Sequence, residues 1–193
     1  MTYPPLYILR HGQTVWNAQQ RIQGSLDSPL TDLGKAQALQ QHAILSGRDL
    51  TGFDAISSPQ GRAVETARIA LSGLFSHFDQ DPLLCEIGVG IWEGKCRADL
   101  PVVTNATDSE DGALDLYQSA PGGEGFDRLC TRCKSFLGSL SRPSVLVTHG
   151  ITSRMLRVVY LGREVGDLGS VDGGQGVVFH LSDGVQTKLS IGA

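Results

Sequence analysis

The sequence predicts an α/β fold of three layers, in which a mainly parallel sheet lies between helices on both faces. Short apolar runs alternate along the chain with segments of helical periodicity. Two of those runs end in the same dipeptide, His11-Gly12 and His149-Gly150, as expected for strands whose carboxyl ends meet at one sheet edge. The length of 193 residues suits a single domain, 1–193, with a core of its own.

The composition argues against several classes of function. The formal net charge is -4, so we expect no basic surface that would attract nucleic acid or an anionic membrane. No apolar run approaches the length of a membrane span, and Met1–Pro5 lacks the pattern of a secretory leader. We therefore expect a cytoplasmic protein that binds neither nucleic acid nor membrane. The sequence does not indicate an oligomeric state, which leaves a homo-oligomer open.

The four cysteines fit reduced thiols better than a disulfide framework. Cys130 and Cys133 have CxxC spacing, but no second such pair or histidine pair completes a tetrahedral zinc site. Both fall on the apolar stripe of a helix predicted over 126–140 and are expected to pack in the core. No metal and no cofactor is expected.

The first part of the chain begins with a strand at residues 6–9, and the polar stretch 14–28 follows as a loop with one helical turn. A helix is predicted from Thr31, which can act as its N-cap, to Gly47. The apolar face of this helix is expected to consist of Leu33, Ala36, Leu39 and Ala43.

The second strand is predicted at 53–58, where Pro59 ends it and a helix follows. Arg62 falls in the first turn of that helix, although the helix dipole disfavours a cation there. A residue placed against this local rule suggests that an anion binds nearby, and the alternative at this point is a solvent-facing arginine in the first turn. A third extended segment is predicted at 82–87 and contains Glu86.

Residues 88–121 are predicted to leave the sheet as an excursion, either a lid over the site or a plain solvated insertion. Glu124 then precedes the helix over 126–140. Capping of this helix and a favourable interaction with its dipole explain an acidic residue at this position. A strand at 144–148, a helix ending at Gly162 and a closing hairpin complete the chain. The strand ends are expected to gather four titratable side chains in one pocket: His11, Arg62, Glu86 and His149.

Six stretches of the chain follow one another in the order LRHGQTVWN, RIQGSLDSPLTDLGKAQA, SSPQGRAVETA, EIGVGIWEG, PGGE and VTHG. Together they resemble the histidine phosphatase superfamily, the phosphoglycerate-mutase-like phosphatases. The resemblance extends from Ile8 to Gly150. The chain departs from it at Gln13, where the family often has Glu, and at Gly125, where it often has Ser. Neither position carries a reacting group.

The resemblance implies a phosphoglycerate-mutase-like fold and a phosphohistidine intermediate on His11, with Glu86 as the proton donor. It also implies a clamp for the phosphate made of Arg10, Arg62 and His149, with Asn17 as a neutral donor. Arginine suits this task because its planar fork can hold two phosphate oxygens. Further substrate-binding positions are expected at Gly150, Arg21, Gln23 and Gly24.

Three functions are weighed against one another. The first is a metal-independent phosphatase that acts on a small phosphorylated metabolite. The second is a cofactor-dependent phosphoglycerate mutase, which has to keep water from the phosphohistidine and is disfavoured because the excursion is short. The third is a non-catalytic module that binds a phosphorylated ligand, and it is disfavoured because His11 and Glu86 are both present.

Overall fold

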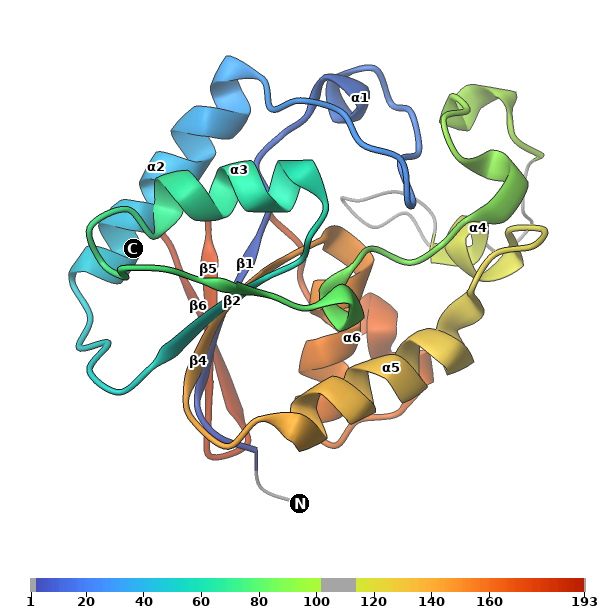
Figure 1. Cartoon of the computed structure of the whole chain (residues 1–193). Helices are drawn as coiled ribbons and strands as arrows, with labels where there is room; N and C mark the ends of the chain where they lie inside the picture. The colour runs from blue at the N-terminus through green and yellow to red at the C-terminus, as the bar shows by residue number, and fades with distance from the viewer. Residues whose placement is uncertain (1–2, 102–113, 193) are drawn as a thin grey trace.

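The computed structural model describes residues 3–101 and 114–192 and contains a mixed sheet of six strands in the order β3-β2-β4-β1-β5-β6 (Figure 1). The strands are β1 (Leu6–Arg10), β2 (Asp54–Ser57), β3 (Asp79–Gln80), β4 (Ser144–Thr148), β5 (Val178–Ser182) and β6 (Val185–Leu189). The first four run parallel, whereas β5 and β6 form the predicted antiparallel hairpin. The predicted α/β fold class is confirmed. Part of the excursion, residues 102–113, lies outside the described residues.

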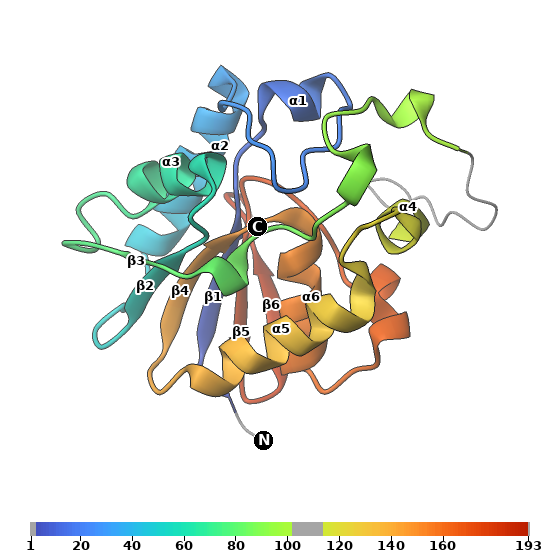
Figure 2. The ribbon, with the colours of Figure 1, turned by 45° about the vertical axis from the view of Figure 1, so that its right-hand side comes forward.

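Helices cover both faces of the sheet, with α2 and α3 on one side and α5 and α6 on the other (Figures 1 and 2). The α-helices are α1 (Val15–Ala18), α2 (Asp32–Ser46), α3 (Gly61–Ala70), α4 (Leu114–Ser119), α5 (Gly125–Ser139) and α6 (Gly150–Tyr160). Cys130 and Cys133 are buried on α5, as predicted. None of the helices in the described part of the chain has the length and apolar character needed to span a bilayer.

The sheet is buried from both sides because its strands are apolar on both faces. Along β1, Leu6 and Ile8 pack in the core under α5 and α6, whereas Tyr7 and Leu9 pack in the core under α2 and α3. Fully packed strands of this kind fix the positions at which they end.

The register of the parallel strands brings three strand ends together. Arg10 pairs with Thr148, and Ser57 pairs with Val147. The backbone N–H of His11 donates to the Thr148 carbonyl over 2.9 Å, so the ladder continues one residue beyond β1. His11, Ser58 and His149, which directly follow β1, β2 and β4, therefore emerge side by side at one edge.

The prediction of an extended segment at 82–87 is wrong. β3 is only the two residues Asp79–Gln80, and Pro82–Leu84 forms a 3-10 helix. The Asp81 side chain accepts a hydrogen bond from the Leu83 N–H over 2.8 Å, and proline fixes the first helical position. The chain consequently turns away from the sheet edge, and Glu86 approaches the site from a loop.

The predicted apolar face of α2 is also wrong, since Leu33 and Leu39 are 53% and 59% exposed. The buried positions are Gly34, Ala38, Gln41, Ile44 and Leu45. A Cβ atom on Gly34 would lie 2.1 Å from the Gln13 carbonyl oxygen, and one on Gly12 would lie 2.1 Å from the Gly34 oxygen. This backbone-to-backbone approach, which only glycine permits, sets the rotation of α2.

Candidate active site

A small cavity of about 40 Å³ opens at the carboxyl ends of the strands. Eight of the ten predicted site residues line it: Arg10, His11, Asn17, Arg21, Gln23, Gly24, Arg62 and Glu86. The other two lie directly beside them. The His149 ring centre is 5.1 Å from that of His11, and a Cβ atom at Gly150 would lie 3.2 Å from the central guanidinium carbon of Arg10. The cavity holds roughly three water molecules, which is the scale of a phosphoryl group.

His11 is held in one orientation at the floor of this cavity and is only 2% exposed. Its Nδ1 lies 2.8 Å from the Gly12 carbonyl oxygen. Because a carbonyl oxygen can only accept, Nδ1 carries the hydrogen, and Nε2 is the lone-pair nitrogen of the neutral ring. Burial, with the charges of Arg62 and Arg10, lowers the pKa of His11 well below its usual value. His11 therefore has the protonation state that a nucleophile requires.

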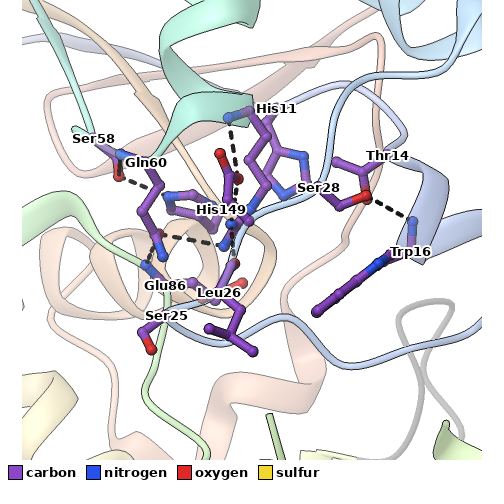
Figure 3. A network of polar contacts seen from close by, with 12 residues as sticks. His11, Thr14, Trp16, Ser25, Leu26, Ser28, Ser58, Gln60, Glu86 and His149 are labelled. Carbon is purple, nitrogen blue, oxygen red and sulfur yellow. Dashed lines mark hydrogen bonds and ion pairs between the residues drawn. The ribbon is translucent and has the colours of Figure 1, made fainter. Parts of the chain in front are cut away.

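His149 is fully buried at the N-cap position of α6. Its Nε2 lies 2.8 Å from the hydroxyl oxygen of Ser58, whereas its Nδ1 is buried with no hydrogen-bond partner among the described residues (Figure 3). Burial and the charge of Arg62 lower the pKa of His149 well below its usual value. A buried ring nitrogen without a partner is rare in folded proteins and marks a position where a ligand oxygen can bind.

Arg62 leaves the first turn of α3 and points into the loop that follows α1. It is 1% exposed and donates to Asp27 Oδ1 over 2.9 Å. It also donates to the carbonyl oxygens of Leu26 and Gly24, over 2.8 and 3.0 Å. These acceptors offset the unfavourable position near the helix N-terminus that the sequence indicated. The Arg62 Nε is buried without a partner in the described structure.

Glu86 is anchored at the N-terminus of α6 by both carboxylate oxygens. They accept hydrogen bonds from the backbone N–H groups of Ile151 and Thr152, over 3.2 and 3.1 Å. The Thr152 hydroxyl lies 3.1 Å from the same oxygen as its N–H group. Since a helix N-terminus presents free N–H donors, α6 fixes the carboxyl group beside the cavity in one orientation.

The loop that carries Glu86 is held from the other side by an ion pair that the sequence analysis missed. Glu124 binds Arg132 through both oxygens, at 2.8 and 2.9 Å, and makes no side-chain cap to α5. Arg132 also donates to the carbonyl oxygens of Leu83 and Cys85. Glu124 does lie at the N-terminus of α5, as predicted, but the predicted side-chain cap is wrong. Side chains that pair along a helix are three or four residues apart, so the spacing of eight gave no signal for this contact.

A larger outer cavity of about 310 Å³ adjoins the inner one, because Arg10, Asn17, Arg21 and Arg97 line both. Three glutamines complete its wall: Gln13, Gln20 and Gln175. The Arg21 guanidinium lies over the Trp16 ring at 4.2 Å, and Arg97 donates to the Tyr117 hydroxyl over 2.8 Å. No carboxylate in the described part of the chain lines this cavity. It suits a polar ligand that carries negative charge.

Because His11 and His149 are buried, we expect the stability of the fold to depend on pH in a specific way. In the unfolded chain each titrates near pH 6.5, whereas burial lowers the pKa of both in the folded chain. Between those values the unfolded chain binds more protons, so the free energy of unfolding decreases as the pH falls below about 6.5. Each histidine contributes a slope of at most about 1.4 kcal/mol per pH unit.

Urea unfolding of the wild type and of His149→Gln at about pH 7.5 and about pH 5.5 checks this expectation. The variant should lose less stability between the two pH values than the wild type does. An equal loss in both proteins would contradict the assignment of a low pKa to His149.

The acidic side chains of the site do not form a metal centre. Within residues 3–101 and 114–192, no group of three or more His, Cys, Asp or Glu side chains is arranged to hold a metal ion. Among the described residues that line the inner cavity, only Glu86 is acidic, and four arginines surround it: Arg10, Arg21, Arg62 and Arg97. The chemistry of this donor set favours an anion over a cation.

Known proteins share this architecture. The family model described as histidine phosphatase superfamily (branch 1) matches residues 6–183. A probable phosphoglycerate mutase GpmB of Enterobacter sp. (strain 638) is 35% identical over 169 residues, which cover 81% of this chain and 74% of that protein.

Two solved structures are similar in fold to this chain over nearly its full length. A putative alpha-ribazole-5'-P phosphatase from Escherichia coli has a TM-score of 0.78 at 25% identity and covers 98% of this chain and 96% of its own. The mycobacterial glucosyl-3-phosphoglycerate phosphatase Rv2419c has a TM-score of 0.76 at 27% identity. The match covers 97% of this chain and 98% of that structure's chain. Since the family model spans most of the sequence and the folds coincide, the chain belongs to the histidine phosphatase superfamily and is an enzyme of the phosphatase class.

Proposed function

We propose that this protein hydrolyses a small phosphomonoester through a phosphohistidine on His11. The observation that carries the proposal is the Nδ1 contact of His11 with the Gly12 carbonyl, which leaves Nε2 as the lone-pair nitrogen of a side chain in the anion-sized cavity. Arginine side chains on the cavity wall supply the positive charge that a phosphoryl group requires.

In the first step, His11 Nε2 attacks the phosphorus atom and forms a P–N bond while the ester P–O bond breaks. The leaving alkoxide takes a proton from Glu86. In the second step, water attacks the phosphohistidine, Glu86 accepts a proton from that water, and inorganic phosphate leaves. Glu86 thus returns to its starting protonation state, and the net reaction is hydrolysis of one ester bond.

The charge that spreads over the phosphoryl oxygens is stabilised by fixed donors: Arg10, Asn17, Arg62 and His149. Arg62 offers its unpartnered Nε, and His149 offers its unpartnered Nδ1. Both groups are already held in place by other contacts, so little reorganisation is needed when phosphate binds.

The outer cavity supports a substrate that carries hydroxyl groups or a second acidic group next to the phosphomonoester. Arg21, Arg97 and the three glutamines offer donors to both kinds of group. The phosphatase activities named for the two structural relatives, on alpha-ribazole-5'-P and on glucosyl-3-phosphoglycerate, concern phosphomonoesters of this polar type.

A phosphoglycerate mutase is the second candidate, and the name of the relative at 35% identity favours it. A mutase has to keep water from the phosphohistidine. Among the described residues, the outer cavity reaches the surface at the exposed side chain of Gln20, which favours transfer to water.

One assay separates the two candidates. Phosphate release is followed with p-nitrophenyl phosphate, sugar phosphates, nucleoside monophosphates and phosphoglycerates, each with and without a chelator. Isomerisation of 3-phosphoglycerate is followed in parallel by a coupled assay. We expect hydrolysis to be faster than isomerisation and insensitive to the chelator. Isomerisation faster than hydrolysis of every ester would overturn the proposal.

A further inference from the structure

Gln60 lies at the N-cap position of α3, between the sheet and Arg62, and its side-chain amide contacts three parts of the site (Figure 3). Its Oε1 accepts from the backbone N–H of Glu86 over 2.9 Å and from Arg62 Nη2 over 3.3 Å. Its Nε2 donates to the Gly24 carbonyl over 2.9 Å. One amide therefore joins the loop of the proton donor, a phosphate-binding arginine and the loop that lines the inner cavity.

We propose that Gln60 is a positioning residue, which fixes Glu86 and Arg62 relative to each other and so sets the efficiency of proton transfer to the leaving group. This inference rests on the proposed function, since it assigns to Glu86 the role of proton donor. Gln60 itself does not line the inner cavity and is not expected to contact the phosphoryl group.

The contact with Glu86 matters because this residue belongs to no strand. The loop before it is held toward α5 by Arg132, through the carbonyl oxygens of Leu83 and Cys85. The N–H of Glu86 is held toward α3 by Gln60. Without the second contact the peptide at Glu86 can shift, and the carboxyl group that it carries then moves relative to the inner cavity. A displacement on the order of 1 Å is enough to cost roughly 100-fold in rate when it separates reacting groups.

The hydrogen bonds around Gln60 also fix the orientation of its amide. The Gly24 carbonyl accepts from both Gln60 Nε2 and Arg62 Nη2, and Gln60 Oε1 accepts from the same Arg62 nitrogen. Reversing the amide would place its NH₂ group against two donors, the Arg62 nitrogen and the Glu86 N–H. Only a side chain with an acceptor and a donor in this order satisfies all three neighbours.

The test compares leaving groups. An alkyl phosphate such as glycerol phosphate expels an alkoxide that needs a proton, whereas p-nitrophenyl phosphate expels a phenolate that is stable without one. Gln60→Met keeps the length of the side chain and removes the three hydrogen bonds of its amide. We expect its kcat/KM for glycerol phosphate, divided by that for p-nitrophenyl phosphate, to be lower than the wild-type ratio by roughly tenfold or more.

The matched control is Gln40→Met, the same substitution at an exposed position on α2, which should keep the wild-type ratio. Both substrates are assayed on one sample, so the ratio does not depend on the fraction of molecules that are folded. An unchanged ratio in Gln60→Met, whether the two rates fall together or not at all, overturns the inference. A wild type that hydrolyses neither ester instead overturns the proposed function, and the inference falls with it.

Discussion

Replacing His11 with alanine is expected to lower kcat/KM by roughly 10⁴- to 10⁶-fold, the range for loss of a catalytic nucleophile. The neighbouring groups cannot substitute for it. The His149 ring is fully buried, and its Nε2 is held against Ser58. The four cysteines include none that lines the inner cavity in the described structure. The variant therefore retains the phosphate-binding donors but has no group that can form the P–N bond.

The measurement is a chemical trap. Wild-type protein turning over a radiolabelled phosphomonoester is denatured, and a label that is stable to alkali and lost in acid reports phosphohistidine. We expect that label in the wild type and none in His11→Ala. His77→Ala, at an exposed histidine away from the site, is the control that should keep both label and rate. Equal hydrolysis by His11→Ala and the wild type would remove His11 from the mechanism.

Replacing Arg62 with lysine is expected to lower kcat/KM by roughly 10³-fold, although the positive charge remains. The guanidinium donates to Asp27 and to the carbonyl oxygens of Leu26 and Gly24, while its buried Nε has no partner in the described structure and is the atom proposed to bind the phosphoryl group. A lysine ammonium cannot contact all of these acceptors and the phosphoryl group at once. We also expect the free energy of unfolding to fall by about 1–3 kcal/mol, because the buried Gly24 carbonyl and the partly exposed acceptors on Leu26 and Asp27 lose their donor.

Steady-state kinetics and the affinity for inorganic phosphate check this expectation on the same protein sample. Arg68→Lys, at an exposed arginine on the same helix, is the matched control and should behave as the wild type. Wild-type kinetics in Arg62→Lys would show that charge alone suffices, which contradicts the role given to the planar fork.

The sequence predicted those parts of the site that depend on local pattern. His11 and His149 end two apolar strands, and any parallel sheet brings such ends to one edge. The helices, the hairpin and the Thr31 cap follow from periodicity and capping residues in the same way. The single-domain boundary 1–193 and the proposed lid stay predictions.

The remaining features depend on contacts between distant segments. The rotation of α2 is set by Gly34 against Gln13, and a periodicity count gives no weight to a glycine. The mostly apolar run at 82–87 predicts an extended segment that contains Glu86, whereas an Asp81 cap turns Pro82–Leu84 into a 3-10 helix. Gln60 and Arg132 act through backbone groups far away in sequence, which no spacing rule encodes.

The division of the site into an inner and an outer cavity has a consequence for engineering. The inner cavity is small and is lined by groups that the reaction needs, whereas Gln13, Gln20 and Gln175 line only the outer cavity. Directed evolution toward new esters can therefore draw its libraries from Gln13 and Gln20, whereas Gln175 also donates to the His11 carbonyl oxygen over 3.1 Å and is better left unchanged. Substrate selectivity can then be varied at Gln13 and Gln20 without replacing any residue that lines the inner cavity.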